Sequence, residues 1–302
     1  MSVSDTPSHT GYYAPHYWPT WIAYAGLRSV VYLPWRAQGI LGAAIGTLVR
    51  VFSQRRRHIA AVNIARCLPE LSPAAQRRLL TSHFQALGFS LLETADAYWM
   101  PRPRLRAFVT FSGLENLQAA LALRRGVLLL TAHFTTLEIG GAFIRSELPR
   151  LRCVYRPNSN PLLDTLIKHG RERVAELAIP RHHVREILKS LKDNIPVWYA
   201  PDQGYRGAQS AMISFFGYPA PTTTATSRIA RASRSPVVPF FAERLPGGHG
   251  YRLWIEPMLV DFPSDDPVAD TERLHRVLEQ QIRRAPEQYL WSHDRFKIMP
   301  RP

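Results

Sequence analysis

The sequence predicts an α/β fold, in which a mixed central sheet is covered by helices on both faces. Short apolar runs recur along the chain after Gly113, and helical segments lie between several of them. Residues 12–52 are aromatic and apolar, which predicts an N-terminal membrane-associated helical segment ahead of the sheet. We therefore expect two parts, residues 1–58 and a single α/β domain over residues 59–302.

The composition supports a folded chain with a basic surface. The 302 residues are 46% hydrophobic, enough to bury a core without disulfides. Cys67 and Cys153 are too far apart for a Cys-x-x-Cys site and are typical of buried thiols in a reduced compartment. With 38 basic and 23 acidic side chains, the net charge is +15, which nucleic acid, an anionic membrane face or an acidic protein would complement. Residues 1–10 are polar and lack a basic start, so we expect no cleavable signal peptide and a cytoplasmic location for most of the chain.

The N-terminal segment has the composition of a membrane interface. Arg28, Arg36 and Arg50 interrupt it, so no run of about 18 strongly apolar residues is present for a spanning helix. Its Tyr and Trp rings favour the headgroup level, and a cationic cluster comes next at residues 55–58. We favour a segment embedded in the membrane with this cluster on the cytoplasmic side, and leave open whether it spans or lies in the interface. The alternative is a buried hairpin of two core helices.

The remaining elements are predicted from local signals. Ser72 and Pro73 form a helix start, followed by apolar residues at helical spacing. Five apolar runs predict buried strands, at Val127–Leu130, Cys153–Tyr155, Val197–Tyr199, Val237–Phe241 and Tyr251–Ile255. Helices are predicted at Leu114–Leu123, Ile139–Glu147, Leu162–Leu177, Val184–Leu191, Thr224–Arg234 and Asp270–Arg284.

The most informative local feature is a buried strand that ends in His133 and turns into a helix containing Glu138. Ligands and catalytic groups gather at such strand ends. The two residues are five apart and would diverge by about 140° on one helix, so they can meet only across a turn. If Thr135 caps the helix, Glu138 occupies the first turn and could accept a proton from one ring nitrogen of His133. The other nitrogen would then act as a base toward a substrate hydroxyl.

A structural interpretation of the same residues stays open, because Thr135-x-x-Glu138 is also a capping box. The sequence contains no Ser or Cys in a recognisable nucleophile elbow and no His, Cys and Asp cluster with metal spacing. Direct transfer with a general base therefore fits better than a covalent intermediate.

A series of motifs in fixed order resembles the late lipid A biosynthesis acyltransferases, the lauroyl and myristoyl transferase family of Gram-negative bacteria. Any single motif is weak, but the ordered set covers nearly the whole chain, including Leu33-Pro34, Arg56-Arg57 and Leu68-Pro69-Glu70 upstream. The downstream motifs are His133-x4-Glu138, Tyr155-Arg156-Pro157 with Asn160-Pro161, Pro201-Asp202-Gln203, Phe215-Phe216-Gly217-Tyr218-Pro219-Ala220, Pro286-Glu287-Gln288-Tyr289-Leu290-Trp291 and Arg295-Phe296-Lys297.

The resemblance implies a glycerolipid-acyltransferase-like fold and transfer of an acyl chain from acyl carrier protein to a hydroxyacyl hydroxyl of a lipid A precursor. His133 would be the base, Glu138 would orient it, and no acyl-enzyme, metal or further cofactor would be needed. Arg156, Asn160, Asp202 and Gln203 match positions expected to bind substrate. The implied location is the bacterial inner membrane with the catalytic domain on the cytoplasmic side, against an anionic membrane surface and without nucleic acid. The His-x4-Glu form favours a laurate-type enzyme.

Several alternatives remain at this level. Arg156 also fits a structural ion pair, and Asp202 with Gln203 fits a plain turn. Arg228, Arg231 and Arg234 recur every three residues, as in a solvated helix face or a docking strip for an acidic carrier protein. Departures from the expected motifs, at Ser159, Gly204, Arg206 and Asp294, put the acceptor contacts in doubt more than the reaction.

Two other functions are compatible with the sequence. A glycerophospholipid or another envelope lipid could be the acceptor, because fold does not fix substrate. A noncatalytic basic protein that binds membranes or nucleic acid would instead show salt-sensitive binding that is indifferent to His133.

Overall fold

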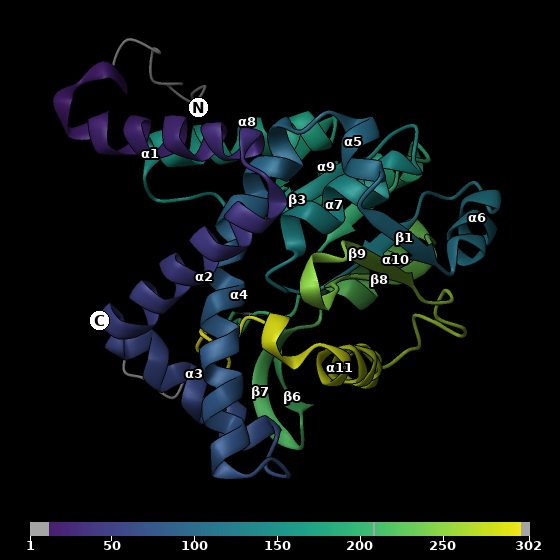
Figure 1. The fold of residues 1–302 in the computed structure, drawn as a ribbon. Helices are drawn as coiled ribbons and strands as arrows, with labels where there is room; N and C mark the ends of the chain where they lie inside the picture. The colour runs from purple at the N-terminus through teal and green to yellow at the C-terminus, as the bar shows by residue number, and fades with distance from the viewer. Residues whose placement is uncertain (1–11, 208, 297–302) are drawn as a thin grey trace.

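A computed structural model describes residues 12–207 and 209–296, and its centre is a seven-stranded sheet in the order β1-β9-β8-β2-β5-β3-β4 (Figure 1). Neighbouring strands are parallel except for β8 and β9, which are antiparallel, so the prediction of a mixed sheet is confirmed. The strands are β1 Val109–Ser112, β2 Leu128–Leu130, β3 Arg152–Tyr155, β4 Leu177–Pro180, β5 Val197–Tyr199, β8 Val237–Arg244 and β9 Tyr251–Ile255. A separate hairpin pairs β6 Ser210–Phe215 with β7 Tyr218–Thr223.

Helices account for most of the remaining described chain. They are α1 Trp18–Ser29, α2 Trp35–Phe52, α3 Gln54–Cys67, α4 Pro73–Trp99, α5 Arg102–Arg106, α6 Leu114–Ala122, α7 Leu137–Ser146, α8 Pro161–Val174, α9 Val184–Lys192, α10 Ala225–Ser233 and α11 Pro267–Arg284. Short 3₁₀ turns lie at Pro15–Tyr17, Val30–Tyr32, Pro246–Gly248 and Pro286–Gln288. The predicted start of α4 is confirmed: Pro73 is its first residue, and the Ser72 hydroxyl accepts the N–H of Ala75 at 3.3 Å.

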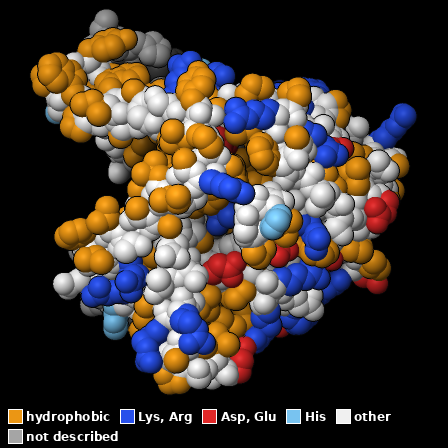
Figure 2. All heavy atoms as spheres, viewed as in Figure 1, with side chains coloured by type: hydrophobic (Ala, Val, Ile, Leu, Met, Phe, Trp, Pro, Cys, Tyr) orange, Lys and Arg blue, Asp and Glu red, His pale blue; other side chains and the backbone are white. Residues whose placement is uncertain are grey.

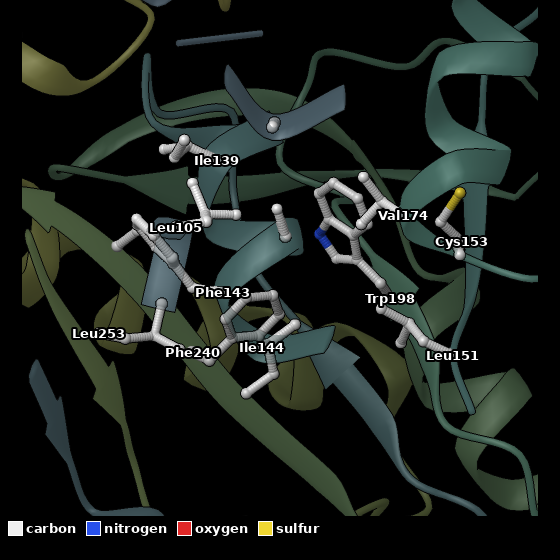
Figure 3. Close-up of a cluster of buried hydrophobic side chains, with 14 of the residues drawn as sticks. Leu105, Ile139, Phe143, Ile144, Leu151, Cys153, Val174, Trp198, Phe240 and Leu253 are labelled. Carbon is white, nitrogen blue, oxygen red and sulfur yellow. The ribbon is translucent and has the colours of Figure 1, made fainter. Parts of the chain in front are cut away.

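Helices cover both faces of the sheet, as the sequence predicts. Alternate side chains of the β2 run point to opposite faces: Val127 and Leu129 belong to one apolar cluster, and Leu128 and Leu130 to another. The first cluster includes residues of α4, α6, α7 and α8, and Figure 3 shows part of it around Phe143 and Trp198. The second includes residues of α9, α10 and α11. Because β2 is buried from both sides, a rigid core fixes the position of the residues at its carboxyl end.

The sequence patterns failed to predict four of the strands, namely β1, β4, β6 and β7. The helix predicted for residues 162–177 ends at Val174, and Leu177 instead begins β4, which pairs in parallel with β3. Strand β1 and the β6–β7 hairpin were not predicted at all. Strands of four to six residues next to helical runs have no clear periodicity of their own, so their sheet partners decide their structure.

The N-terminal helices pack on the surface of the α/β core rather than inside it. Helix α2 lies along α4, where Gly42 and Gly46 of α2 meet Gly88 of α4 (Figure 1). No residue of α1 is buried, and only Gln38, Gly42 and Gly46 of α2 are, so the alternative of a buried core hairpin is wrong. Helix α3 runs through residue 58, and the predicted division of the chain therefore falls inside a helix.

The outer side of α1 and α2 is strongly apolar. Hydrophobic side chains gather over α1 and along α2 in the space-filling view (Figure 2). The most exposed are Trp18 at 58% and Ile22 at 72% on α1, and Ile40 at 75%, Leu48 at 57% and Phe52 at 80% on α2; Tyr32, in the turn between the helices, is 84% exposed. Within residues 12–207 and 209–296, we find no helix with the length and hydropathy needed to cross a membrane.

Candidate active site

His133 and Asp202 come together because they lie just after neighbouring parallel strands. Strand β2 pairs with β5 in the register Leu130↔Tyr199, and the Thr131 N–H donates to the Tyr199 carbonyl at 2.9 Å, which extends the ladder by one residue. His133 and Asp202 then lie at the carboxyl edge of the sheet, where catalytic groups gather in α/β proteins. The sequence predicts both residues at strand ends but not their contact.

The Asp202 carboxylate holds both the backbone and the ring of His133. The His133 N–H donates to the two carboxylate oxygens, each at 3.1 Å, and ring Nδ1 lies 2.6 Å from Oδ1. Burial alone would raise the pKa of Asp202, but the nearby charges of His133 and Arg295 and the hydrogen bonds from His133 lower it to about 2. Asp202 is therefore an acceptor at neutral pH, and Nδ1 of His133 carries the ring proton.

The other ring nitrogen of His133 is available for chemistry. With the proton on Nδ1, Nε2 has a free lone pair in the neutral ring. No hydrogen bond to Nε2 is found among the residues that the structure describes, and the side chain is 27% exposed while Asp202 is only 4% exposed. This pair has the geometry of a general base, in which a buried carboxylate binds one ring nitrogen and leaves the other for the substrate.

The C-terminal segment after α11 closes the site from one side. The Tyr289 hydroxyl donates to Oδ2 of Asp202 at 3.3 Å, the Leu290 N–H donates to the His133 carbonyl at 3.0 Å, and the Gly204 N–H donates to Nε2 of His293 at 3.1 Å. Tyr289 belongs to one of the sequence motifs, but the sequence predicts no role for it. Lys297, which completes the last motif, lies outside the described residues.

The predicted orientation of His133 by Glu138 is wrong in this structure. The Glu138 carboxylate accepts the Nε–H of Arg171 on α8 at 3.1 Å and the Tyr98 hydroxyl of α4 at 2.9 Å. Burial would lower the pKa of Arg171, but the Glu138 charge raises it above its usual value. The turn between strand and helix directs the two side chains to different neighbours, and Asp202 takes the position expected for Glu138.

The capping-box interpretation is also wrong. Helix α7 begins at Leu137, so Glu138 does lie in its first turn, but the preceding Thr136 donates its hydroxyl to the Ala242 carbonyl. The Thr135 hydroxyl is buried without a hydrogen-bond partner in the described part of the chain. Glu138 therefore does not cap α7, and among the described residues it forms hydrogen bonds with Arg171 and Tyr98 rather than with His133. These hydrogen bonds join α7 to α8 and α4.

The three other predicted substrate-binding residues have different surroundings. Arg156 lies just after β3, next to β5 in the sheet, and is exposed at the same edge as His133; no ion pair engages it among the described residues, so the ion-pair alternative is wrong. The Asn160 side chain caps α8 by accepting the Leu163 N–H at 3.2 Å. Gln203 is partly exposed in the turn after Asp202. Substrate contacts of these three residues stay predictions.

Neither cysteine fits a nucleophile. Cys67 and Cys153 are buried and unpaired, and burial raises the pKa of each thiol to about 12. The prediction of ordinary buried thiols is confirmed. Fold and site together define an α/β enzyme whose partly exposed, carboxylate-bound histidine is suited to removing a proton from a substrate.

Comparison with known proteins identifies the family. The model of the bacterial lipid A biosynthesis acyltransferase family matches residues 6–298, and the chain belongs to this family. The lipid A biosynthesis lauroyltransferase of Escherichia coli K12 is 37% identical over 95% of this chain and 94% of its own. The palmitoleoyltransferase of the same strain is 36% identical over 95% and 93%. These relatives make the chain an acyltransferase, so the noncatalytic alternative is set aside.

A solved structure gives a more distant likeness. The 1-acyl-sn-glycerophosphate acyltransferase of Thermotoga maritima has a TM-score of 0.38 and 11% identity, covering 81% of this chain and 95% of that one.

Proposed function

We propose that this acyltransferase moves a fatty acyl chain, laurate for preference, from an acyl carrier protein thioester to a hydroxyacyl hydroxyl of a lipid A precursor. The acceptor is supported by the family and by relatives that are named for lipid A biosynthesis. Laurate is supported by the lauroyltransferase relative, although a palmitoleoyltransferase is almost as similar.

The observation that carries the mechanism is the 2.6 Å contact between Nδ1 of His133 and Asp202, which leaves Nε2 as the base. In the proposed step, Nε2 removes the proton from the acceptor hydroxyl while the oxygen attacks the thioester carbonyl carbon. The C–S bond then breaks, and the imidazolium returns the proton to the departing thiolate. Asp202 stabilises the imidazolium in between. No acyl-enzyme and no cofactor take part.

Arg156 is the proposed contact for negative charge at this edge of the sheet. It is exposed and lies just after β3, two strands from β2 in the sheet order. A guanidinium there suits a phosphate of the acceptor or the developing oxyanion. Gln203, in the turn beside Asp202, and Asn160, at the start of α8, are proposed to line the same acceptor region.

The proposed carrier-protein contact is the basic strip of α10. Arg228 and Arg234 are exposed, and Arg231, also exposed, is paired with Asp265 at 3.0 Å. The exposed guanidinium groups of Arg228 and Arg234, both at this helix, complement an acidic carrier protein. The pairing of Arg231 supports the solvated-face interpretation for that residue.

The proposed location is the cytoplasmic side of the bacterial inner membrane, with α1 and α2 against the lipid. The exposed apolar side chains of these helices, together with the Arg55–Arg57 cluster, fit an interface with anionic lipid. Vesicle co-sedimentation tests this. Ile40→Glu with Phe52→Glu should abolish binding, whereas Val260→Glu, at an equally exposed residue away from these helices, should not.

Purified protein tests the reaction directly. Laurate, myristate and palmitoleate are offered as carrier-protein thioesters with a Kdo-bearing lipid A precursor or a lysophospholipid, and mass spectrometry measures the acylated product. We expect laurate transfer to the precursor and its loss in His133→Ala at matched folded concentration. Transfer only to the lysophospholipid would favour the glycerophospholipid alternative, and full activity of the variant would remove His133 as the base.

A further inference from the structure

A buried arginine without a local counter-ion lies close to the proposed base. Arg295 is 2% exposed, and among the described residues no carboxylate forms a salt bridge with it. Its Nη1 donates to the Pro221 carbonyl at 3.0 Å, its Nη2 donates to the Thr222 hydroxyl oxygen at 2.6 Å, and its Nε has no partner in the described part of the chain. Buried arginines are normally paired with a carboxylate, so this cation requires an explanation.

The groups that touch Arg295 are neutral. Nδ1 of His275 lies 2.7 Å from the Ser214 carbonyl and therefore carries the ring proton, which leaves Nε2 to accept from Arg295 at 3.2 Å. Burial and the charge of Arg295 lower the pKa of His275 to about 4. The Thr222 hydroxyl donates its own hydrogen bond to the Ala220 carbonyl at 3.0 Å. The guanidinium charge of Arg295 is thus stabilised by neutral hydrogen-bond acceptors, and no carboxylate in contact with it neutralises the charge in the described part of the chain.

The complementary charge is Asp202. Asp202 lines one pocket together with Thr222 and His275, the two side chains that bind Arg295. The side chains that hold Arg295 thus border the same pocket as Asp202, and because both charged groups are buried, water screens their attraction weakly. Without Arg295, the uncompensated carboxylate would draw a proton onto the ring that it already contacts.

We propose that Arg295 is a positioning residue that balances the buried charge of Asp202 and thereby keeps His133 in its free-base form at neutral pH. The inference rests on the proposed role of His133 as the base. It adds that the C-terminal segment sets the working pH of the site as well as closing it, because Tyr289 and Arg295 both act on Asp202 from that segment.

Three titratable groups around the pair are neutral in the physiological range. Burial raises the pKa of Tyr289 well above its usual value and that of Cys67 to about 12, so both are neutral in the physiological range. His275 is neutral above pH 5. His293 accepts the Gly204 N–H, and His293→Gln serves as a control for any contribution of this ring. Beside Tyr289, Cys67 and His275, Arg295 is thus the charged group at neutral pH.

The experiment compares the full chain with Arg295→Gln, which removes the charge, and Arg295→Lys, which keeps it. Arg283→Gln is the matched control, because this α11 arginine is half exposed and pairs with Glu70 at the surface. Two midpoints are measured against pH. One is the acid limb of kcat/KM, and the other is the rate of diethylpyrocarbonate modification of His133, read by peptide mass spectrometry, which needs no turnover.

We expect both midpoints to rise by about one pH unit in Arg295→Gln and to stay near wild type in the lysine and control variants. Should Arg295→Gln fail to fold, Thr222→Asp neutralises Arg295 in place and should raise both midpoints in the same direction. If both midpoints stay unchanged in Arg295→Gln while kcat/KM falls equally at every pH, the role of Arg295 is structural and the inference is overturned. If His133 of the wild-type protein is modified by diethylpyrocarbonate as expected but the protein transfers no acyl chain, only the proposed function fails. A raised modification midpoint in Arg295→Gln would then still support the inference.

Discussion

Nδ1 of His133 lies 2.6 Å from Oδ1 of Asp202, although the two residues are 69 positions apart. Each residue lies shortly after its strand, and β2 and β5 are adjacent in the sheet. The backbone N–H of His133 also binds the carboxylate, so Asp202 fixes the loop as well as the ring. The carboxylate therefore selects one tautomer and one ring orientation before any substrate binds.

Asp202→Asn should leave the fold intact and remove most of the activity. An asparagine amide placed against Nδ1 donates rather than accepts, which moves the ring proton to Nε2 and removes the base. We expect kcat/KM to fall by about 10²–10⁴-fold, the range seen when a base loses its orienting carboxylate. Asp265→Asn, at an exposed surface pair, is the control. Unchanged kcat/KM in Asp202→Asn would contradict the assignment.

Glu138→Gln should act mainly on stability. Its carboxylate binds Arg171 and Tyr98 in a partly buried cluster, and neutralising it leaves the Arg171 cation without its partner. Breaking such a pair lowers the free energy of unfolding by about 2–4 kcal/mol. Denaturant unfolding measures the loss, and kcat/KM per folded molecule should fall far less than in Asp202→Asn. Equal losses of activity in the two variants, with Glu138→Gln fully stable, would return Glu138 to the catalytic step.

The sequence was sufficient to predict strands β5 and β9 to the residue, and β2, β3 and β8 within a few residues, because buried runs of apolar residues have few other solutions. It also placed His133 and Asp202 at strand ends. It could not pair them, because contact depends on the lateral order of the strands, which puts β5 rather than β3 beside β2. The sequence therefore favoured Glu138, which is near His133 in the chain, as the partner of its ring, whereas Asp202 is the residue that lies beside the ring in space.

Arg295 was beyond prediction for a related reason. Its burial depends on the β6–β7 hairpin, which supplies Pro221 and Thr222, and on α11, which supplies His275. Arginine in a C-terminal segment of a basic chain otherwise indicates a solvated charge. Only the assembled contacts show that this one is buried beside the active site.

The contact between α2 and α4 allows no added side chain. A Cβ atom at Gly88 would lie 2.1 Å from the Gly42 carbonyl oxygen, whereas one at Gly39 of α2 meets nothing within 4 Å. Gly88→Ala should therefore destabilise the protein by about 1–3 kcal/mol through overpacking. Gly39→Ala, the matched control, should be neutral or stabilise by about 0.5–1 kcal/mol through helix propensity. Similar melting temperatures for both variants would contradict the close packing of these helices.

Stability should fall between pH 6.5 and pH 4, in part because of His275. Its folded pKa of about 4 lies below the usual value of about 6.5, so the unfolded chain binds more protons across this window. The protein is accordingly more stable above pH 6.5 and loses that contribution as pH falls, by up to about 3 kcal/mol from this residue. The cause is visible in the structure, because a second ring proton would point at Arg295.

Denaturant unfolding at pH 7.5 and pH 4.5 measures this contribution, with His275→Gln as the test variant. A glutamine cannot titrate, so the difference in unfolding free energy between the two pH values should shrink relative to wild type. His169→Gln is the control, because this α8 histidine is exposed and should leave the difference unchanged. If His275→Gln keeps the full wild-type difference, the neutral partner assigned to Arg295 is incorrect, and the account of how that cation is held must change with it.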